Sequence, residues 1–347
     1  MRFSLIFFGA LLVGCNSTDS PDDYAQPNTV PGGVYILNEG EWQKNNSSLQ
    51  WVYPQTGEVV GTNTRGIWDQ LNWGDTGNFL SARNDTGAVV VSGSNRIDFF
   101  LTDNGRFLKS FFFGNLKVEP REIISAGDGT WWVSSFERHS VIRIRPSNLT
   151  IVEEQFTDLK PEHLIIANGY LWVSATGWGA GTTVNRINLK SNSFQAIEVG
   201  LNPARIVETS TQMVVLILDN PWGESPDSRV VTLNKVSGEV TGTYRFGETL
   251  YSMDRESGDY IQLQTATRLI RWIPGQESFT VLQVFADKPT TGSIVYEMSV
   301  DTVKNVTWLT SINNYTSPGW LEGFRNGERL YGPIQVGINP GSILWNY

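Results

Sequence analysis

The chain has 347 residues, thirteen tryptophans and a formal net charge of −9. This negative charge, with no run of Lys or Arg, argues against nucleic-acid binding, which requires clustered cations to neutralise phosphates. About 40% of the residues are hydrophobic, only 18% are charged, and there are 34 glycines. Such a balance is typical of an all-β domain with many turns.

The N-terminus is predicted to be a lipoprotein signal peptide, residues 1–14. Arg2 is followed by an apolar run over 3–11 that is too short to span a membrane. Leu12-Val13-Gly14-Cys15 then resembles a bacterial lipobox, in which the cysteine is lipidated and becomes the mature N-terminus. Acyl chains on Cys15 would anchor the protein to a membrane surface. Cys15 is the only cysteine, so a disulfide framework is excluded. The alternative is an ordinary signal peptide that ends at a chance cysteine.

Residues 15–32 are predicted to form a flexible acidic tether, because they are polar and lack strand signals. An acidic stretch directly after the cysteine resembles the surface-export signal of Bacteroidetes lipoproteins; a plain solvated linker is the alternative. We therefore expect an outer-membrane protein that is lipid-anchored and exposed on the cell surface, or alternatively faces the periplasm.

After the tether, a short apolar segment of one type recurs seven times. The copies are residues 34–37, 88–91, 130–133, 170–173, 213–216, 259–263 and 306–309. A period of about 40 to 50 residues built from short β-rich runs is typical of a propeller or another repeat array. We interpret the seven runs as the second strand of each of seven blades.

A second unit, often a proline and then an apolar strand, precedes most of these runs. Pro120, Pro161 and Pro203 begin clear copies, whereas the first blade lacks one at its start. The missing copy lies at the end of the chain, at 339–345. The sequence therefore predicts an all-β, seven-bladed β-propeller over 33–347. One C-terminal strand plus three N-terminal strands would close the ring, so that no sheet edge is left free.

The predicted blades place many tryptophans on one face. If each blade is a four-stranded meander, the loops after its second strand and the crossovers to the next blade share a face. Four such loops, 38–48, 176–183, 219–228 and 312–323, and the crossover 64–77 contain Trp42, Trp178, Trp222, Trp320, Trp68 and Trp73. The other seven tryptophans fall in strands, where packing between blades explains them: Trp51, Trp131, Trp132, Trp172, Trp272, Trp308 and Trp345.

Large aromatic side chains in loops of Gly and Asn require an explanation, because turns ordinarily carry small polar residues. One interpretation is a broad platform for a bulky ligand, which stacks on Trp and hydrogen-bonds to amides and hydroxyls. The proposed polar contacts are Asn45, Asn46, Asn314 and Tyr315, with His139 as a charged contact. The alternatives are that each Trp folds back as a plug against the sheet, and that His139 belongs to a solvated rim.

Conventional catalytic and metal motifs are absent from the sequence. His139 and His163 are too far apart for metal-ligand spacing. No phosphate-binding loop and no nucleophile elbow occurs. We therefore expect no cofactor and no metal, and a non-enzymatic function is favoured.

The stretch at 33–42, Gly-Val-Tyr-Ile-Leu-Asn-Glu-Gly-Glu-Trp, and the Asn-Asn-Ser-Ser-Leu at 45–49 carry a family resemblance. The chain resembles the YncE-like seven-bladed propeller lipoproteins of the Bacteroidetes surface, of the cobalamin-binding BtuG type, over nearly its whole mature length. The resemblance implies a protein that captures cobalamin and caps a TonB-dependent outer-membrane transporter.

Other functions remain open at this stage. A Trp-rich face also suits glycans, because sugar rings stack on indole. A propeller lactonase or lyase would use polar groups around a divalent metal at the central channel; the candidates are Glu39, Glu137, His139, Asp219 and Asp254. An exposed aromatic face also fits a protein-interaction scaffold.

Overall fold

The computed structural model describes residues 32–61, 74–220, 227–284, 291–292 and 294–345. The predicted signal peptide, the lipidation site Cys15 and the tether up to residue 31 lie outside these residues. Trp68, Trp73 and Trp222 also lie outside them. The predictions made for these positions therefore stay predictions.

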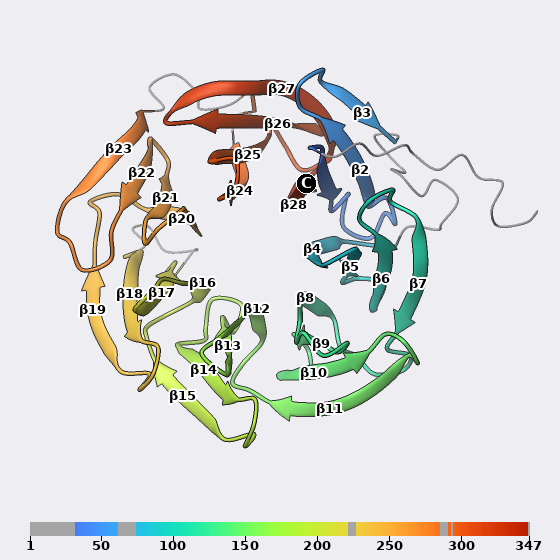
Figure 1. Ribbon diagram of the computed structural model, residues 1–347, viewed down its shortest axis with the longest axis vertical. Helices are drawn as coiled ribbons and strands as arrows, with labels where there is room; N and C mark the ends of the chain where they lie inside the picture. The colour runs from blue at the N-terminus through green and yellow to red at the C-terminus, as the bar shows by residue number, and fades with distance from the viewer. Residues whose placement is uncertain (1–31, 62–73, 221–226, 285–290, 293, 346–347) are drawn as a thin grey trace, which may run out of the picture.

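Seven four-stranded antiparallel sheets form the blades of a ring around a central channel (Figure 1). In the first blade, the last strand of the chain pairs with the first, from Val34 opposite Trp345 to Leu37 opposite Ser342. This pairing confirms the predicted closure by one C-terminal and three N-terminal strands. It also confirms the predicted count of seven blades.

The blades are given from the innermost to the outermost strand. Blade 1 consists of β28 (Pro340–Trp345), β1 (Val34–Asn38), β2 (Ser48–Tyr53) and β3 (Glu58–Val60). Blade 2 consists of β4 (Gly77–Arg83), β5 (Thr86–Val91), β6 (Arg96–Leu101) and β7 (Phe107–Phe112). Blade 3 consists of β8 (Pro120–Ser125), β9 (Trp131–Ser135), β10 (Ser140–Arg145) and β11 (Thr150–Phe156).

The remaining blades repeat this order. Blade 4 consists of β12 (Pro161–Ala167), β13 (Tyr170–Ala175), β14 (Thr183–Asn188) and β15 (Phe194–Glu198). Blade 5 consists of β16 (Pro203–Glu208), β17 (Gln212–Ile217), β18 (Arg229–Asn234) and β19 (Val240–Tyr244). Blade 6 consists of β20 (Leu250–Arg255), β21 (Ile261–Thr265), β22 (Arg268–Trp272) and β23 (Phe279–Val284). Blade 7 consists of β24 (Ile294–Asp301), β25 (Val306–Ile312), β26 (Pro318–Arg325) and β27 (Glu328–Ile338).

The second strand of each blade explains the recurring apolar run. These strands are covered on both faces by neighbouring blades, so every residue of β1, β9, β21 and β25 is buried. A strand buried on both faces reads as a continuous apolar run rather than an alternating one. The outermost strands are more exposed instead, as β11 illustrates, because none of its residues is buried. The repeat in the sequence is therefore the signature of the buried second strand.

The hydrophobic core is divided among the seams between blades. Each seam contains a cluster of buried side chains, and the described residues provide one cluster for each of the seven seams. The closing seam, between blades 7 and 1, packs Trp308 and Leu321 against Val34 and Ile36. Each blade thus depends on both neighbours for its burial, so loss of a strand at one seam exposes apolar surface on the blade next to it.

The seven tryptophans predicted to lie in strands all lie in strands. Trp42 and Trp178 lie in loops between second and third strands, as predicted. The prediction for Trp320 was wrong: it lies in β26, paired with Ser311 of β25. The predicted loop 312–323 is shorter than expected, because β26 already begins at Pro318, and the first residue of a strand is a position where proline is tolerated.

Among the described residues, none forms a helix long and apolar enough to cross a membrane.

Candidate functional site

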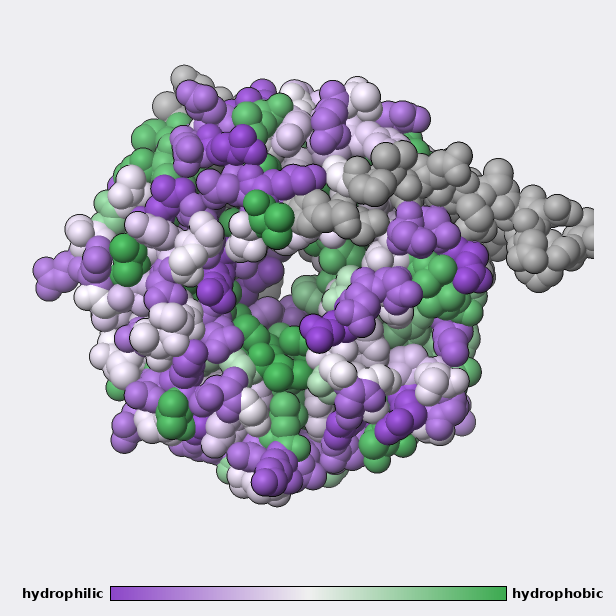
Figure 2. All heavy atoms as spheres, viewed as in Figure 1, coloured by the Kyte–Doolittle hydropathy of each residue, from purple (hydrophilic) through white to green (hydrophobic). Residues whose placement is uncertain are grey.

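The mouth of the central channel on one face is the candidate functional site. The loops from second to third strands and the crossovers between blades share this face, which we call the loop face. Each innermost strand starts on the loop face, because it directly follows a crossover. The seven innermost strands, β28, β4, β8, β12, β16, β20 and β24, surround the channel (Figure 1). The space-filling view shows that the middle of the ring is open (Figure 2).

All seven innermost strands carry a register shift within their first few residues. In β8 the regular pairing is interrupted between Pro120 and Ile123, and in β16 between Pro203 and Arg205. The other five strands show the same irregularity at their starts. A bulge changes the direction of the side chains beside it. Because the bulge recurs at the start of every innermost strand, the two residues beside it form two rings at the channel mouth.

We name these rings by their position relative to the bulge. The upper ring contains the second residue of each innermost strand, or the third in β24, whose bulge starts one residue later: Asn78, Arg121, Glu162, Ala204, Tyr251, Tyr296 and Gly341. The lower ring contains the residue after it: Phe79, Glu122, His163, Arg205, Ser252, Glu297 and Ser342. The residue that follows is buried in every case: Leu80, Ile123, Leu164, Ile206, Met253, Met298 and Ile343.

The lower ring is linked by charged hydrogen bonds across blades. Nδ1 of His163 lies 2.8 Å from a carboxylate oxygen of Glu122, and its Nε2 lies 2.8 Å from the carbonyl of Ile206. Nη1 of Arg205 in blade 5 lies 2.7 Å from Oε1 of Glu297 in blade 7. Blade 6 lies between these two blades, and its residue at this level is the small Ser252. Both charged side chains therefore extend into the channel to meet each other.

Arg121 is the centre of the upper ring on the side of blade 3. Its guanidinium donates to Glu119 at 2.8 Å and to Oδ1 of Asn78 at 3.3 Å. The same group lies 4.1 Å from the centre of the Phe136 ring. Its Nε is 3.9 Å from Glu162, whose pKa burial raises. Arg121 therefore interacts with two carboxylates, one side-chain amide and the face of one aromatic ring.

Glu39 enters the mouth from the loop that follows β1. Its Oε2 accepts a hydrogen bond of 2.8 Å from the hydroxyl of Tyr296. Its Oε1 covers Gly341, where a Cβ would lie only 2.3 Å from this oxygen. Burial raises the pKa of Glu39 to about 7, although the charge of Arg121 opposes the shift. A carboxyl group that titrates near neutral pH thus faces the channel mouth.

Three predicted aromatic residues are strongly exposed on the loop face. Trp42 is 77% exposed, Trp178 is 70% exposed and Tyr315 is 60% exposed. Trp178 meets the edge of Phe136 at 6.3 Å, and the ammonium of Lys160 lies 5.2 Å from its ring. These exposures exclude the alternative in which Trp42 and Trp178 are plugs folded against the sheet.

The side chains predicted to make polar contacts with a ligand differ in how many bonds they already make within the protein. Asn45 is exposed, whereas Asn46 accepts a bond of 2.7 Å from the backbone of Glu41 and holds its own loop. Oδ1 of the exposed Asn314 accepts from the backbone and hydroxyl of Thr316. Nδ1 of His139 accepts from the backbone of Lys160 at 2.9 Å. Asn46, Asn314 and His139 are thus engaged in shaping their loops.

The five candidates for catalysis are not brought together. Glu39 lies at the mouth, and Asp254 lies lower on β20, accepting from the backbone of Val300 at 2.8 Å. The exposed Glu137 pairs with Lys160, while His139 shapes a loop. Asp219 accepts from the backbone of Asp227 and closes its loop. Across the described ranges, no group of three His, Cys, Asp or Glu side chains could hold a metal ion.

The rings of the channel mouth escaped the sequence interpretation. The signal was present in Pro-Arg-Glu-Ile at 120–123, Pro-Glu-His-Leu at 161–164 and Pro-Ala-Arg-Ile at 203–206. Two residues recur between the proline and the buried apolar residue, and in these copies most of them are charged. Charges at a fixed place in a repeat gather at one level of a ring, because the repeats are arranged around a common axis.

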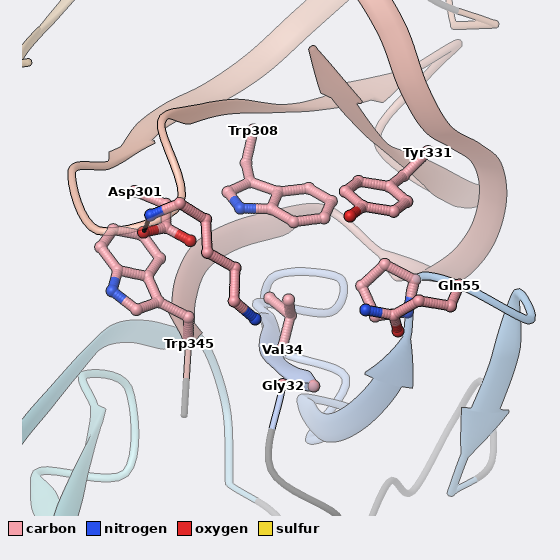
Figure 3. Close-up of a pocket in the computed structure, with 10 residues that line it drawn as sticks. Gly32, Val34, Gln55, Asp301, Trp308, Tyr331 and Trp345 are labelled. Carbon is pink, nitrogen blue, oxygen red and sulfur yellow. Dashed lines mark hydrogen bonds between the residues drawn. The ribbon is translucent and has the colours of Figure 1, made fainter. Parts of the chain in front are cut away.

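A second hollow lies on the opposite face, at the seam of blades 7 and 1 (Figure 3). Trp308 stacks on Tyr331 at 5.4 Å, and Val34 and Trp345 complete the wall. Its volume of about 10 Å³ suits a single water molecule. The channel mouth is therefore the better candidate for a ligand site.

Comparison with known proteins supports the β-propeller fold and does not identify a ligand. No protein-family model and no curated protein sequence matches the chain. Hydrazine synthase from Kuenenia stuttgartiensis superposes with a TM-score of 0.63 at 13% identity, over 77% of this chain and 88% of that one. Virginiamycin B lyase from Staphylococcus aureus gives 0.59 at 13% identity, over 78% and 88%. A quinonprotein alcohol dehydrogenase-like protein from Bacteroides thetaiotaomicron gives 0.65 at 14% identity, over 91% and 78%.

The chain is thus a seven-bladed β-propeller whose loop face carries exposed aromatic residues around a charged channel mouth. Its structural neighbours differ widely in function, and identities this low show the fold alone. The resemblance to the YncE-like and BtuG-type lipoproteins therefore stays a prediction from the sequence.

Proposed function

We propose that the protein binds a bulky ligand on the loop face, over the channel mouth. The observation that carries this proposal is the exposure of Trp42, Trp178 and Tyr315 on one face, around a mouth lined with charged groups. Exposed aromatic residues supply stacking area, and the rings supply polar contacts that fix orientation. The site is open and broad, which suits a large ligand.

In its finer form, the proposal is a lipid-anchored surface protein that captures a nutrient and delivers it to a TonB-dependent outer-membrane transporter. Cobalamin is the first ligand to test, because its flat corrin and amide arms match stacking combined with hydrogen bonding. Glycans are the second class, because sugar rings also stack on indole. Lipidation of Cys15, predicted from the lipobox-like Leu12-Val13-Gly14-Cys15, would place the protein on a membrane surface.

Binding of cyanocobalamin and of a glycan panel to the purified protein, measured by calorimetry and tryptophan quenching, tests the proposal. We expect Trp178→Ala to weaken binding roughly tenfold or more, because it removes an exposed stacking surface. Phe194→Ala is the matched control, since Phe194 is 46% exposed at the start of the outer strand β15. Absence of binding to either class, or equal loss in both variants, would contradict the proposal.

An enzymatic function is the second candidate, and Glu39 favours it. A carboxyl group with a pKa of about 7, hydrogen-bonded to Tyr296 in an open mouth, suits general acid–base chemistry. Turnover of lactone or lyase substrates that is abolished by Glu39→Gln would favour catalysis over simple binding.

A further inference from the structure

We infer that Glu39 and two tyrosines near it, Tyr296 and Tyr315, bind the ammonium group of an organic ligand. This inference rests on the proposed function, because it assigns a ligand chemistry to one sector of the same channel mouth. The sector consists of Glu39, Tyr296 and Tyr315, and we call it the tyrosine corner.

The carboxylate of Glu39 is placed for a cation that the protein does not supply. Its Oε2 accepts from the hydroxyl of Tyr296, a neutral partner. No Lys or Arg nitrogen of the described residues lies within 4.0 Å of it, in contrast to Glu137, which Lys160 approaches to 3.2 Å. Gly341 has no side chain, and Oε1 of Glu39 occupies the place where its Cβ would lie. The acceptor is therefore held at the mouth without direct contact to a cation of the described residues, and the charge of Arg121 acts on it only from a distance.

Two aromatic rings lie near this carboxylate. Tyr296, which donates to Glu39, meets Tyr315 edge to face, with ring centres 6.3 Å apart at 68°. Tyr315 is 60% exposed. Exposed aromatic faces beside a carboxylate are the chemistry that recognises organic ammonium groups.

The opposite sector of the mouth has the reverse character. There Arg121 and Lys160 cover the face of Phe136, at 4.1 and 4.4 Å from its centre. These cations already occupy the aromatic face with which a ligand cation would interact. The mouth is thus divided: cations cover Phe136, whereas Tyr315 is exposed near a carboxylate that no Lys or Arg of the described residues contacts directly.

Choline, ethanolamine and the neutral carbon analogue of choline, dimethylbutanol, are the probes. Binding to the purified protein is measured well above pH 7, where the Glu39 carboxyl group, with its pKa of about 7, is ionised. Calorimetry and tyrosine and tryptophan fluorescence give the affinities. We expect choline to bind at least roughly tenfold more tightly than dimethylbutanol, because only choline is charged. Comparison of choline with ethanolamine distinguishes quaternary from primary ammonium ligands.

Glu39→Gln is expected to reduce choline binding roughly tenfold, while its amide oxygen can still accept from Tyr296. Tyr315→Ala should also weaken binding, whereas Tyr315→Phe, which keeps the ring, should not. Glu137→Gln, a matched carboxylate change on the same face, should have no effect. Equal binding of choline and dimethylbutanol, or choline binding that survives Glu39→Gln, would overturn the inference.

The outcomes separate this inference from the proposed function. If cobalamin or a glycan binds with dependence on Trp178 but choline does not bind, the tyrosine corner is wrong and the binding function stands. If choline binds with dependence on Glu39 while neither nutrient class binds, the inference stands and the proposed function fails.

Discussion

The pKa of Glu39 is set by the fold. In the sequence, Glu39 is one of several acidic residues in a polar loop. In the structure it lies above Gly341 and accepts from Tyr296, two residues that are distant in the chain. Enclosure between blade 7 and blade 1 removes water from the carboxylate, so its pKa rises. The consequence is a group that can change its charge near neutral pH.

This shift predicts a pH-dependent stability. Because burial raises the pKa of Glu39 from 4.5 to about 7, the folded state favours the protonated acid. The associated stability is fully present below pH 4.5 and is lost as the pH rises through about 7. Glu39→Gln does not titrate, so we expect its unfolding free energy to exceed that of the natural protein by about 3 kcal/mol well above pH 7.

Chemical denaturation at several pH values, from acid to mildly alkaline, measures this difference. The two proteins should have similar stability at low pH and diverge as the pH rises. Glu137→Gln serves as the control, because that carboxylate is exposed and paired with Lys160. Parallel profiles for Glu39→Gln and the natural protein would contradict the prediction.

At the scale of elements, each innermost strand has two roles: one side chain packs in a seam between blades, and its neighbours face the channel. In β16 the fourth residue, Ile206, is buried in a seam, while the bulge before it releases the second and third residues to the channel. Arg205 and Glu297 use this arrangement to connect β16 with β24 past the intervening β20. A charge pair therefore links blades that do not share a seam.

We predict that Arg205→Met destabilises the protein by about 2 kcal/mol, because it leaves Glu297 as an unpaired carboxylate in the channel. Burial already raises the pKa of Glu297, so adding Glu297→Gln should recover part of the loss. The matched pair is Arg138 with Glu154, which joins residues of one blade at 2.8 Å. Arg138→Met should cost less than about 1 kcal/mol, since solvent screens that pair.

Denaturant titration of the single and double variants gives both coupling energies. A coupling at Arg205–Glu297 no larger than that at Arg138–Glu154 would show that the channel does not strengthen this pair.

For the whole molecule, closure of the ring is the decisive feature. Both ends of the propeller belong to blade 1, where β28 and β1 pair. Without β28, β1 would be a free edge and the closing seam would lose Ile343. Because every blade is covered by two neighbours, such a loss spreads beyond blade 1.

Truncation after Asn339 tests this. We expect the melting temperature to fall by roughly 10 °C or more, with a broader transition. Truncation after Trp345 keeps β28 intact and is the control. If the shorter chain melts within a few degrees of the control, with a transition as sharp, closure by β28 contributes less than the geometry suggests.

How much the sequence could predict depends on the kind of signal. The buried second strands follow from local composition, because a strand covered on both faces has no freedom to be polar. Trp42 and Trp178 could be placed because a loop between strands of known order has only one face to occupy. Trp320 was misplaced because the third strand of blade 7 begins at Pro318, earlier than the predicted end of the loop at 323.

The channel mouth was harder to predict, because its contacts join residues of different blades. Nothing near Glu39 in the chain indicates Tyr296, and nothing near Arg205 indicates Glu297. The sequence by itself determined the seven blades, their closure and the face that carries the aromatic loops, because repeat period and burial are local properties. Only the tertiary structure decided which charges meet at the channel, because that depends on the ring bringing equivalent positions of distant repeats to a common axis.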